Sequence, residues 1–386
     1  MNFHFVIYSS LSASGGGRET WINQFLPSFS ILCNCKIFVY YFFQGDDTIL
    51  LDAVKKNLQN VYFVPISCKF KNTKYWNILR FIKYVAVVAT LLLRKTNNQS
   101  IVVAVGSFYD AFPIFLAKII SFGFFRFHTV IWLRSILKYQ LRALRIKKYA
   151  ALVLKIERFF LKKSSLVIAN GWDTQKYYKT VGIDSVVIPN AIDLNKFYEQ
   201  EINRSKPIII SYIGRLSQEK GLIQFIEATQ KYKEKNPTSK LIFEVVGDGP
   251  LLGNVLLKVR DTLIYKGRIS NYDMIDYLKK IHCGVALTYN DNENGGGGGL
   301  SNGLLELMAA RKLIIAWDIF TFTQILSKDS ALLVNEGDVD GLVHSFEKIE
   351  NNYSQYFEMI ENNYKKVQDL SIEKHVDKFL SSVLCL

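Results

Sequence analysis

The 386-residue sequence is poor in cysteine, and its cysteines follow no pattern that signals a site. The five are Cys33, Cys35, Cys68, Cys283 and Cys385. Domains held together by disulfides carry a dense cysteine framework, and structural zinc sites use pairs with C-x-x-C spacing. Because neither pattern is present, we expect no disulfide framework and no zinc site, and the cysteine usage indicates a reducing compartment.

Long apolar runs are also lacking. The longest, Tyr84 to Leu93, is flanked by Lys83 and Arg94 and is too short to cross a bilayer, which takes roughly 20 residues. The N-terminal segment Met1–Tyr8 has neither a basic region nor a small-residue cleavage site, so it is predicted to be a strand and not a signal peptide. Hydrophobic residues make up 49% of the chain, which excludes disorder and, at this length, predicts about two domains.

Acidic residues are scarce in one stretch of the chain. Residues 51–163 hold 21 Lys and Arg against three Asp and Glu, whereas residues 201–386 hold 22 against 24, and the whole chain carries +14. Aromatic and aliphatic residues are interleaved with these cations, most densely from Tyr75 to Leu93. A solvated basic face is the plain alternative, but such faces normally mix in acids. We therefore expect this half to meet an anionic surface.

Apolar runs alternate with helical segments along the whole chain, which is typical of parallel sheets covered on both faces. In the first half one helix is predicted from Arg18 to Leu26, ended by Pro27. The expected strands there are Phe3–Ser9, Ile37–Phe42, Val61–Ile66, Ile101–Val105, Leu166–Ala169 and Val186–Ile188.

The second half predicts a doubly wound domain. Its expected strands are Pro207–Tyr212, Leu241–Val246, Leu263–Tyr265, Gly284–Leu287, Leu313–Trp317 and Ala331–Val334, with helices between them and a last helix over about 356–384. The chain is thus predicted to form two Rossmann-like domains joined near 190–206.

Two glycine clusters, Gly15–Gly17 and Gly295–Gly299, each stand between a predicted strand and a helix. Glycine allows close backbone approach, and the amides of a helix N-terminus favour a phosphate. No Gly-Lys-Ser/Thr follows either cluster, and neither reads GxGxxG with a later acidic residue. A P-loop is therefore excluded and a dinucleotide cofactor is disfavoured, while a flexible turn remains the simple alternative.

Three charged residues stand out in the second half. Arg215 and Lys220 lie five residues apart in Gly214–Gly221, directly after a predicted strand, where ligands of open α/β sheets bind. An Arg fork and a Lys point charge suit a diphosphate, although a solvated turn is the alternative. Glu306 sits in an otherwise apolar helical segment, where its carboxylate needs a partner such as the two hydroxyls of a ribose.

Four motifs follow one another along the chain: Val187–Asp193 with Phe197, Tyr212–Leu216 with Glu219–Gly221, Val246–Pro250 and Leu305–Ala310. In their order and spacing they resemble the motifs of family-four glycosyltransferases of the bacterial surface-polysaccharide type, which are retaining enzymes of the GT-B fold. The resemblance covers about residues 186–318 and is weaker in the first half.

The resemblance implies an α/β GT-B fold, with two doubly wound domains facing each other across a cleft and a C-terminal helix packed back on the first domain. Residues 1–190, with 366–386, would form an acceptor-binding and membrane-facing domain, and residues 191–365 a nucleotide-sugar domain. It implies catalytic roles for Arg215 and Lys220 at the diphosphate and for Glu306 at the ribose. The donor-binding residues would be Gly16, Gly17, Gly214, Gly267, Arg268, Ile269, Gly298, Gly299, Leu300, Ser301 and Glu293.

Two positions depart from the family pattern. Where the family has a glutamate that contacts the donor sugar, this chain has Gly298, and Glu293 is the candidate to replace it. Where the family has a histidine after a strand of the first domain, this chain has Arg134, with His128 before the strand. The triplet Asp291-Asn292-Glu293 is interpreted as loop and not as a metal site.

The function that follows is a metal-independent, retaining hexosyltransferase-type enzyme of cell-surface polysaccharide synthesis. It would use a nucleotide-diphosphate sugar, by family frequency UDP-linked, as substrate and would need no cofactor. Its acceptor would be a lipid-linked or lipopolysaccharide-type glycan, presented where the basic half docks on the inner face of the plasma membrane. The alternatives are a GT-B epimerase, phosphorylase or inverting transferase, and, in another class, a nucleic-acid-binding protein or a non-catalytic scaffold. No nucleic-acid-binding motif is present in the sequence.

Overall fold

The computed structural model describes residues 1–9, 11, 17–43, 58–67, 74–121, 127–143, 149–253, 256, 262–270, 273–289 and 300–386. The chain divides into two compact units. The first consists of Met1–Asn190 and Ile372–Leu386, and the second of Ala191–Ser371. Segment 366–371, which the sequence analysis placed with the first domain, thus belongs to the second unit.

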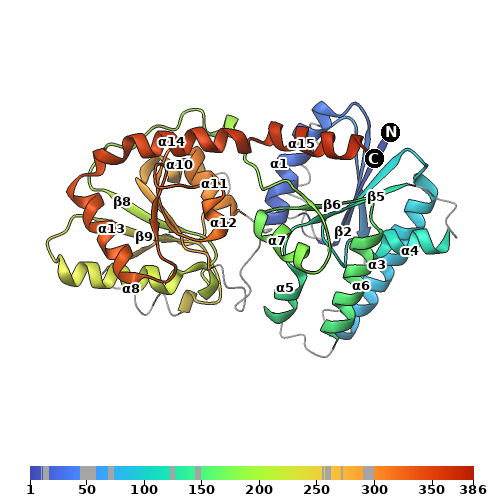
Figure 1. Ribbon diagram of the computed structural model, residues 1–386, viewed down its shortest axis with the longest axis horizontal. Coiled ribbons are helices and arrows are strands. Elements are labelled where there is room, and N and C mark those ends of the chain that lie inside the picture. Colours follow the sequence, from blue (N-terminus) through green and yellow to red (C-terminus); the bar gives the residue numbers. More distant parts are fainter. Residues whose placement is uncertain are drawn as a thin grey trace. The chain divides into compact units, whose positions relative to one another are not determined.

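The first unit is built on a seven-stranded parallel sheet of order β3-β2-β1-β4-β5-β6-β7 (Figure 1). Its strands are β1 (Asn2–Ile7), β2 (Lys36–Phe43), β3 (Val61–Ser67), β4 (Ser100–Ala104), β5 (His128–Leu133), β6 (Leu166–Ala169) and β7 (Val186–Val187). The helices are α1 (Gly17–Leu32), α3 (Lys74–Lys95), α4 (Phe112–Ile120), α5 (Leu137–Ala143), α6 (Ala150–Lys163), α7 (Trp172–Thr180) and α15 (Ile372–Leu384).

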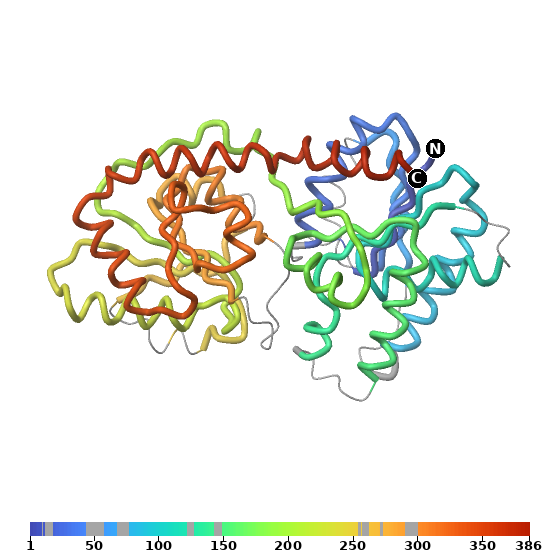
Figure 2. Tube along the Cα trace, viewed as in Figure 1, coloured from blue at the N-terminus to red at the C-terminus, as the bar shows by residue number. Residues whose placement is uncertain are grey.

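Aromatic side chains fill the two faces of this sheet. On one face Phe25 of α1 lies 5.8 Å from Phe5 and 5.5 Å from Phe379 of α15, measured between ring centroids. Helices α1 and α15, from the two ends of the chain, therefore lie side by side (Figure 2). On the other face Val6 and Val102 pack with α3, α4 and α6. Successive strand residues point to opposite faces, so β1, which is apolar at Phe3, Phe5, Val6 and Ile7, serves both layers.

Three features of this unit differ from the sequence expectations. Helix α1 does not end before Pro27 but runs to Leu32 with the proline inside it. Phe25 and Phe29, on either side of Pro27, are fully buried and stack at 5.0 Å, so packing outweighs the lost backbone hydrogen bond. The single long helix expected over 356–384 is two helices, interrupted at residues 368–371. Cys33 and Cys35 are joined by a disulfide, which the sequence analysis did not expect.

The second unit contains a six-stranded parallel sheet of order β10-β9-β8-β11-β12-β13. Its strands are β8 (Ile209–Ile213), β9 (Ile242–Val246), β10 (Ile264–Tyr265), β11 (Cys283–Ala286), β12 (Leu313–Trp317) and β13 (Leu332–Val334). The helices are α8 (Leu222–Lys235), α10 (Met274–Lys280), α11 (Asn302–Ala309), α12 (Phe320–Thr323), α13 (Val339–Asn351) and α14 (Phe357–Val367), with short 3-10 turns such as η2 (Gln218–Lys220). The prediction of two Rossmann-like parallel-sheet domains is confirmed.

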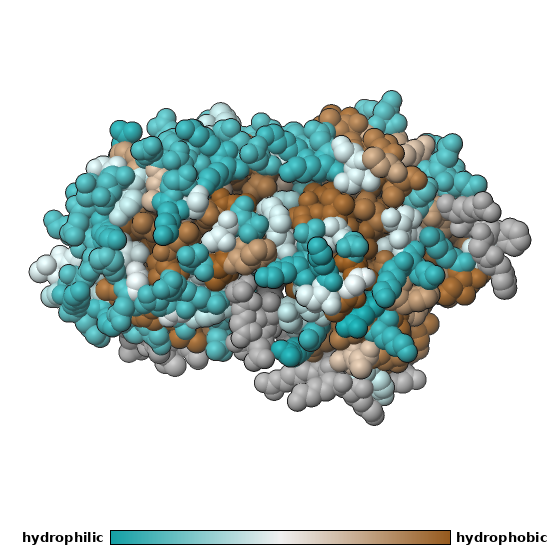
Figure 3. All heavy atoms as spheres, in the orientation of Figure 1, coloured by the Kyte–Doolittle hydropathy of each residue, from teal (hydrophilic) through white to brown (hydrophobic). Residues whose placement is uncertain are grey.

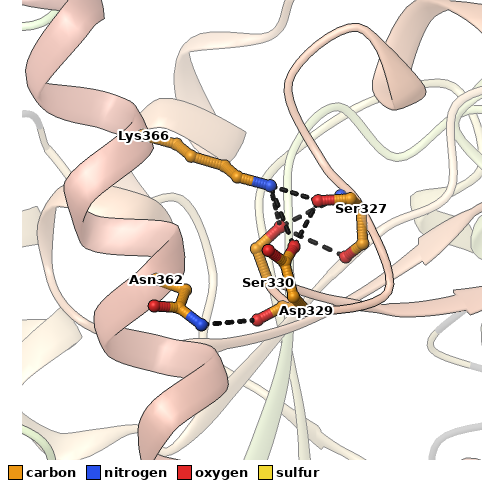
Figure 4. A network of polar contacts seen from close by, with 5 residues as sticks. All are labelled: Ser327, Asp329, Ser330, Asn362 and Lys366. Carbon is orange, nitrogen blue, oxygen red and sulfur yellow. Dashed lines mark hydrogen bonds and ion pairs between the residues drawn. The ribbon is translucent and has the colours of Figure 1, made fainter.

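Helix α14 is anchored to the second unit by polar contacts at its C-terminal end (Figure 4). The Lys366 ammonium donates to Asp329 Oδ1 at 3.0 Å, to Ser330 Oγ at 3.1 Å and to Ser327 Oγ. Asn362 Nδ2 donates to the backbone oxygen of Asp329 at 3.3 Å. These bonds hold the last full turn of α14 against the loop that precedes β13, just before the chain returns to the first unit.

Candidate functional site

The second sheet has a topological switch point at β8, which has β9 on one side and β11 on the other. In open parallel sheets the crevice at such a point, outside the carboxyl ends of the strands, is where ligands bind. The segment Gly214–Gly221 leaves β8 at this end and leads through η2 into α8. Strand order therefore brings the predicted diphosphate residues to the position that best suits a ligand.

Backbone hydrogen bonds join the loops that follow β8, β9 and β10 into one layer. Gly214 N donates to Val246 O at 3.0 Å, and Leu216 N donates to Asp248 O at 2.9 Å. In the next step of the layer Gly247 N donates to Gly267 O at 2.9 Å. The motif residues around 214, 247 and 267, far apart in sequence, are thus held edge to edge.

Two glycines are needed for this layer to form. Gly247 has a φ of +140°, and a Cβ there would lie 1.8 Å from the backbone oxygen of Gly214. Gly221, at the start of α8, has a φ of +69°, and its Cβ would lie 2.4 Å from the oxygen of Leu287 at the end of β11. Any side chain at either position would push the loop after β8 away from its neighbours.

Lys220 and Arg215 are held differently within their shared loop. The Lys220 ammonium donates to Thr288 Oγ1, beyond β11, at 3.3 Å, so it reaches across the switch point. Burial lowers the pKa of Lys220; Glu219 opposes this effect and the charge of Arg215 adds to it. The Arg215 side chain is exposed. The two cations are therefore close enough to repel each other, which is what a site awaiting an anion requires.

Glu219 is hydrogen-bonded through both its side chain and its backbone. Its carboxylate Oε1 accepts a hydrogen bond from Ser217 Oγ at 2.7 Å, and its backbone oxygen accepts one from Tyr289 N at 3.0 Å. Thr288 and Tyr289 are neighbours of the candidate site that the sequence analysis missed. They directly follow the predicted strand Gly284–Leu287, and that position was the available signal.

Glu306 lies on α11, whose first turn is capped by Ser301 Oγ, the acceptor for Leu304 N at 3.2 Å. A Cβ on Gly303 would lie 3.5 Å from Ile213 O, so this helix begins beside the carboxyl end of β8. The Glu306 side chain is half-buried, and within the part of the chain that the structure describes it has no hydrogen-bond or ion-pair partner. Burial raises its pKa to about 7, with a small opposing effect of Lys196.

The other predicted donor-binding residues are distributed as follows. Gly267, with a φ of +75°, opens the segment Gly267–Ile269, in which Arg268 is exposed and Ile269 half-buried. Leu300 is buried, and Ser301 serves as the helix cap. Gly17 begins α1 in the first unit. Gly16, Glu293, Gly298 and Gly299 lie outside the described residues.

A second group of polar residues lies at the carboxyl edge of the first sheet. Asp110, after β4, accepts hydrogen bonds on Oδ1 from Tyr8 N at 2.6 Å and from Arg18 Nη1 at 3.5 Å. Arg18 Nη1 also donates to Val105 O at 3.3 Å. Arg134 follows β5 at the same edge, while His128 is the first residue of that strand and lies at the opposite end. Of these two candidates for a substrate-facing residue, the strand direction favours Arg134.

Comparison with known proteins gives this arrangement a class. Residues 195–366 match the family described as glycosyl transferases group 1, so the second unit is a domain of that family. The chain also shares its two-domain GT-B fold with solved structures. One is Anabaena HepE in complex with UDP (TM-score 0.74, 14% identity, all of both chains covered).

Further similar proteins include one relative in sequence and two more solved structures. TuaC of Bacillus subtilis (strain 168), named as a teichuronic acid biosynthesis glycosyltransferase, is 26% identical over 199 residues, which are 49% of this chain and 47% of TuaC. The match thus spans about half the length of that relative. In fold the chain also resembles the lipopolysaccharide outer core galactosyltransferase WaaB (TM-score 0.70, 16% identity, 100% of this chain and 99% of WaaB covered) and TarM (TM-score 0.74, 12% identity, 99% and 98% covered).

Proposed function

We propose that this protein is a glycosyltransferase that moves a sugar from a nucleotide-diphosphate sugar, with UDP as the nucleotide, to a cell-surface glycan. The observation that carries the proposal is the convergence at the switch point of β8. There the loop after β8 carries the cations Lys220 and Arg215, and α11, which carries Glu306, begins beside the same strand end. Among the described residues the Glu306 carboxylate has no hydrogen-bond or ion-pair partner. Cations for a diphosphate and a carboxylate for a ribose diol are what such a donor requires.

The chemistry proposed for Lys220 and Arg215 is stabilisation of the leaving group. Cleavage of the bond between the anomeric carbon and the nucleotide leaves negative charge on the β-phosphate and positive charge on the sugar ring. A fixed, desolvated donor aimed at the phosphate lowers the barrier by about 3 kcal/mol, and an exposed cation such as Arg215 contributes less. In this proposal the two cations perform the charge neutralisation, the reaction needs no metal ion, and the product retains the anomeric configuration of the donor.

The remaining donor contacts follow from the same layer of loops. Glu306 accepts hydrogen bonds from the two ribose hydroxyls, because no group in the described part of the chain occupies either of its carboxylate oxygens. The segment Gly267–Ile269 lies next to Gly247 in the layer and provides a backbone edge and an apolar side chain for the base. HepE, of the same fold, has been solved with UDP and with UDP-glucose, which supports a uridine donor.

The proposed acceptor is a membrane-presented glycan. The charged and apolar residues exposed on α3, α4 and α6 support this part of the proposal. Across described residues 74–163 the acids are Asp110 and Glu157, and both are buried, so the exposed charge there is positive. Large apolar side chains are exposed on the same three helices, where hydrophobic and hydrophilic spheres lie side by side in Figure 3. They are Ile78, Ile82, Ile119, Ile120, Leu152 and Phe159. We name this set, with the exposed Lys83, Lys155, Lys162 and Lys163, the basic-apolar face.

Such a face suits peripheral docking on an anionic leaflet, where each Lys or Arg contributes about 1 kcal/mol and exposed apolar groups enter the interface. No helix among the described residues is both long and apolar enough to cross a bilayer. Flotation with vesicles containing anionic lipid tests the docking. Binding at low salt that is lost with neutral vesicles is expected, and Ile78→Asp with Phe159→Asp should weaken it. No flotation at low salt would overturn the membrane part of the proposal.

The donor part is tested by thermal unfolding with a panel of nucleotides and nucleotide sugars. A ligand at 100 times its Kd adds about 2.7 kcal/mol to the free energy of unfolding. We expect uridine compounds to do so for the wild-type protein and not for Lys220→Met. With the active donor, NMR analysis of the product's anomeric configuration distinguishes a retaining from an inverting transferase. Absence of any nucleotide effect would refute the proposed function and leave a non-catalytic protein.

A further inference from the structure

Arg134 occupies an unusual position at the carboxyl edge of the first sheet. It follows β5, and its backbone oxygen accepts a hydrogen bond from Asn170 Nδ2 at 3.0 Å. Its Nη2 donates to Asn190 Oδ1 at 2.7 Å, and the guanidinium lies over the indole of Trp21 at 4.4 Å from the ring centroid. Asn190 and Trp21 thus hold the guanidinium in a single orientation.

Arg134 lacks the groups that normally accompany a buried guanidinium. Nη1 is buried, and among the described residues it has no hydrogen-bond acceptor and no carboxylate forms an ion pair with this side chain. The contrast is Arg18 at the same sheet edge, whose Nη1 bonds to Val105 O and pairs with Asp110 at 3.5 Å. Arg134 is therefore a fixed cation with one arm of its fork unused.

The surrounding charges do not compensate for this cation. Burial, and then the charge of Arg18, lower the pKa of Arg134 to about 9, and Glu19 opposes them. Glu19 itself lies beside Arg18, at 4.0 Å from its Nε. Asp110 is engaged by Tyr8 N and Arg18. A buried donor without an acceptor is unfavourable, and a buried charge without a counter-charge is more unfavourable still. A bound anion would supply both the acceptor and the counter-charge.

We infer that Arg134 is the receptor for an oxyanion, a carboxylate or a phosphate, carried by a sugar substrate at the carboxyl edge of the first sheet. A guanidinium binds both groups through two parallel N–H···O bonds. The side chain as a whole is half-buried, while Nη1 itself is buried. The assignment of the anion to a sugar rests on the proposed function, whereas the anion site itself rests on the geometry of the first unit.

The test uses the full chain with the nucleotide site saturated by UDP. Because Trp21 lies under the guanidinium, tryptophan fluorescence and thermal unfolding both report an anion bound there. Titrations with D-glucuronate, inorganic phosphate and neutral D-glucose are run at constant ionic strength on wild type, Arg134→Met, Arg134→Lys and Arg94→Met. Arg94 is the matched control, since it is exposed in the last turn of α3.

We expect at least one anion to bind to wild type and to Arg94→Met, at least tenfold more weakly to Arg134→Met, and glucose not to bind. Arg134→Lys should also bind the anion at least several-fold more weakly, because lysine keeps the charge but lacks the two-pronged guanidinium. If the methionine variant fails to fold, the lysine variant tests the inference in its place. Preference for glucuronate identifies a uronic-acid substrate and preference for phosphate a phosphorylated one. Equal binding by the Arg134 and Arg94 variants, or no response to either anion, overturns the inference.

The Lys220→Met variant separates this inference from the proposed function. It should lose the response to UDP while keeping the response to the anion. An anion response that depends on Arg134, in a protein that binds no nucleotide, would leave the anion site standing and remove the glycosyltransferase assignment. A nucleotide response with no anion response would remove the anion site and leave the glycosyltransferase assignment standing.

Discussion

Replacing Lys220 and Arg215 separately by methionine should have unequal effects, although the two residues share one loop and one charge. The Lys220 ammonium is held by Thr288 Oγ1 in surroundings that lower its pKa, whereas Arg215 is exposed. At about 4 Å, two unit charges interact with roughly 4 kcal/mol in a protein-like medium but only about 1 kcal/mol in water. We therefore expect the loss of Lys220 to cost the larger share of phosphate stabilisation.

In rate terms, Lys220→Met should lower kcat/KM for sugar transfer by about a hundredfold or more, in the range of a lost preorganised donor. Arg215→Met should lower it by about five- to tenfold, the range of an exposed ion pair worth about 1 kcal/mol. The Arg215 effect should shrink as salt shortens the screening length from about 8 Å at 0.15 M to about 3 Å at 1 M, whereas the Lys220 effect should persist.

The assay is steady-state transfer or donor hydrolysis with UDP-glucose, run beside calorimetric titration with UDP and thermal unfolding of the free proteins. Removal of a desolvated cation should leave the unliganded Lys220→Met protein at least as stable as wild type, so lost activity cannot be attributed to unfolding. Equal effects of the two substitutions, or full activity of both, would refute the reasoning that burial sets the strength of the clamp.

Three further predictions follow from single residues. Gly247→Ala should abolish UDP binding and lower the free energy of unfolding by more than 1 kcal/mol, because its φ is positive and the new Cβ would meet Gly214 O. Gly253→Ala is the control, since the space around its Cβ is open. Calorimetry and thermal unfolding should show neither effect for this control. Because the pKa of Glu306 is raised to about 7, its carboxylate forms as pH rises from 6 to 8, and UDP-glucose affinity should rise with it by up to about tenfold. Glu306→Gln should show a flat profile, and a wild-type profile that is equally flat would contradict the ribose role. Burial lowers the pKa of His375 to about 3, so unfolding binds a proton below pH 6.5, and stability should fall by up to about 1.4 kcal/mol per pH unit down to about 3. His4 and His282, whose pKa values burial also lowers, contribute slopes of the same sign, so denaturant unfolding should show a smaller slope in His375→Gln than in wild type, and equal slopes would contradict the prediction.

The secondary structure of the second unit was predicted well because local signals there agree with the fold. The runs Leu241–Val246 and Leu313–Trp317 were both predicted as strands, and the structure has β9 at Ile242–Val246 and β12 at Leu313–Trp317. Errors arose where packing overrode a local rule. Pro27 stands inside α1 because Phe25 and Phe29 on either side of it are buried, and no local pattern records that burial.

The candidate site could be proposed in part from the sequence. Arg215, Lys220 and Glu306 were candidates because glycines, strand ends and a lone carboxylate in an apolar helix are visible locally; their roles stay predictions. Thr288 was missed, since a threonine after a strand is an ordinary residue until a lysine from another strand end reaches it. The same holds for Arg134, whose missing acceptor becomes apparent only with its neighbours in place.

The order of strands and helices, the parallel class of both sheets and the chemistry available at each strand end were already determined by the sequence, because periodicity and turn residues act over a few positions. Which cation is buried, which loops touch and which guanidinium goes without a partner were decided by the tertiary structure. Desolvation and hydrogen bonding depend on atoms brought together from distant positions, as Gly214 and Gly247 are here.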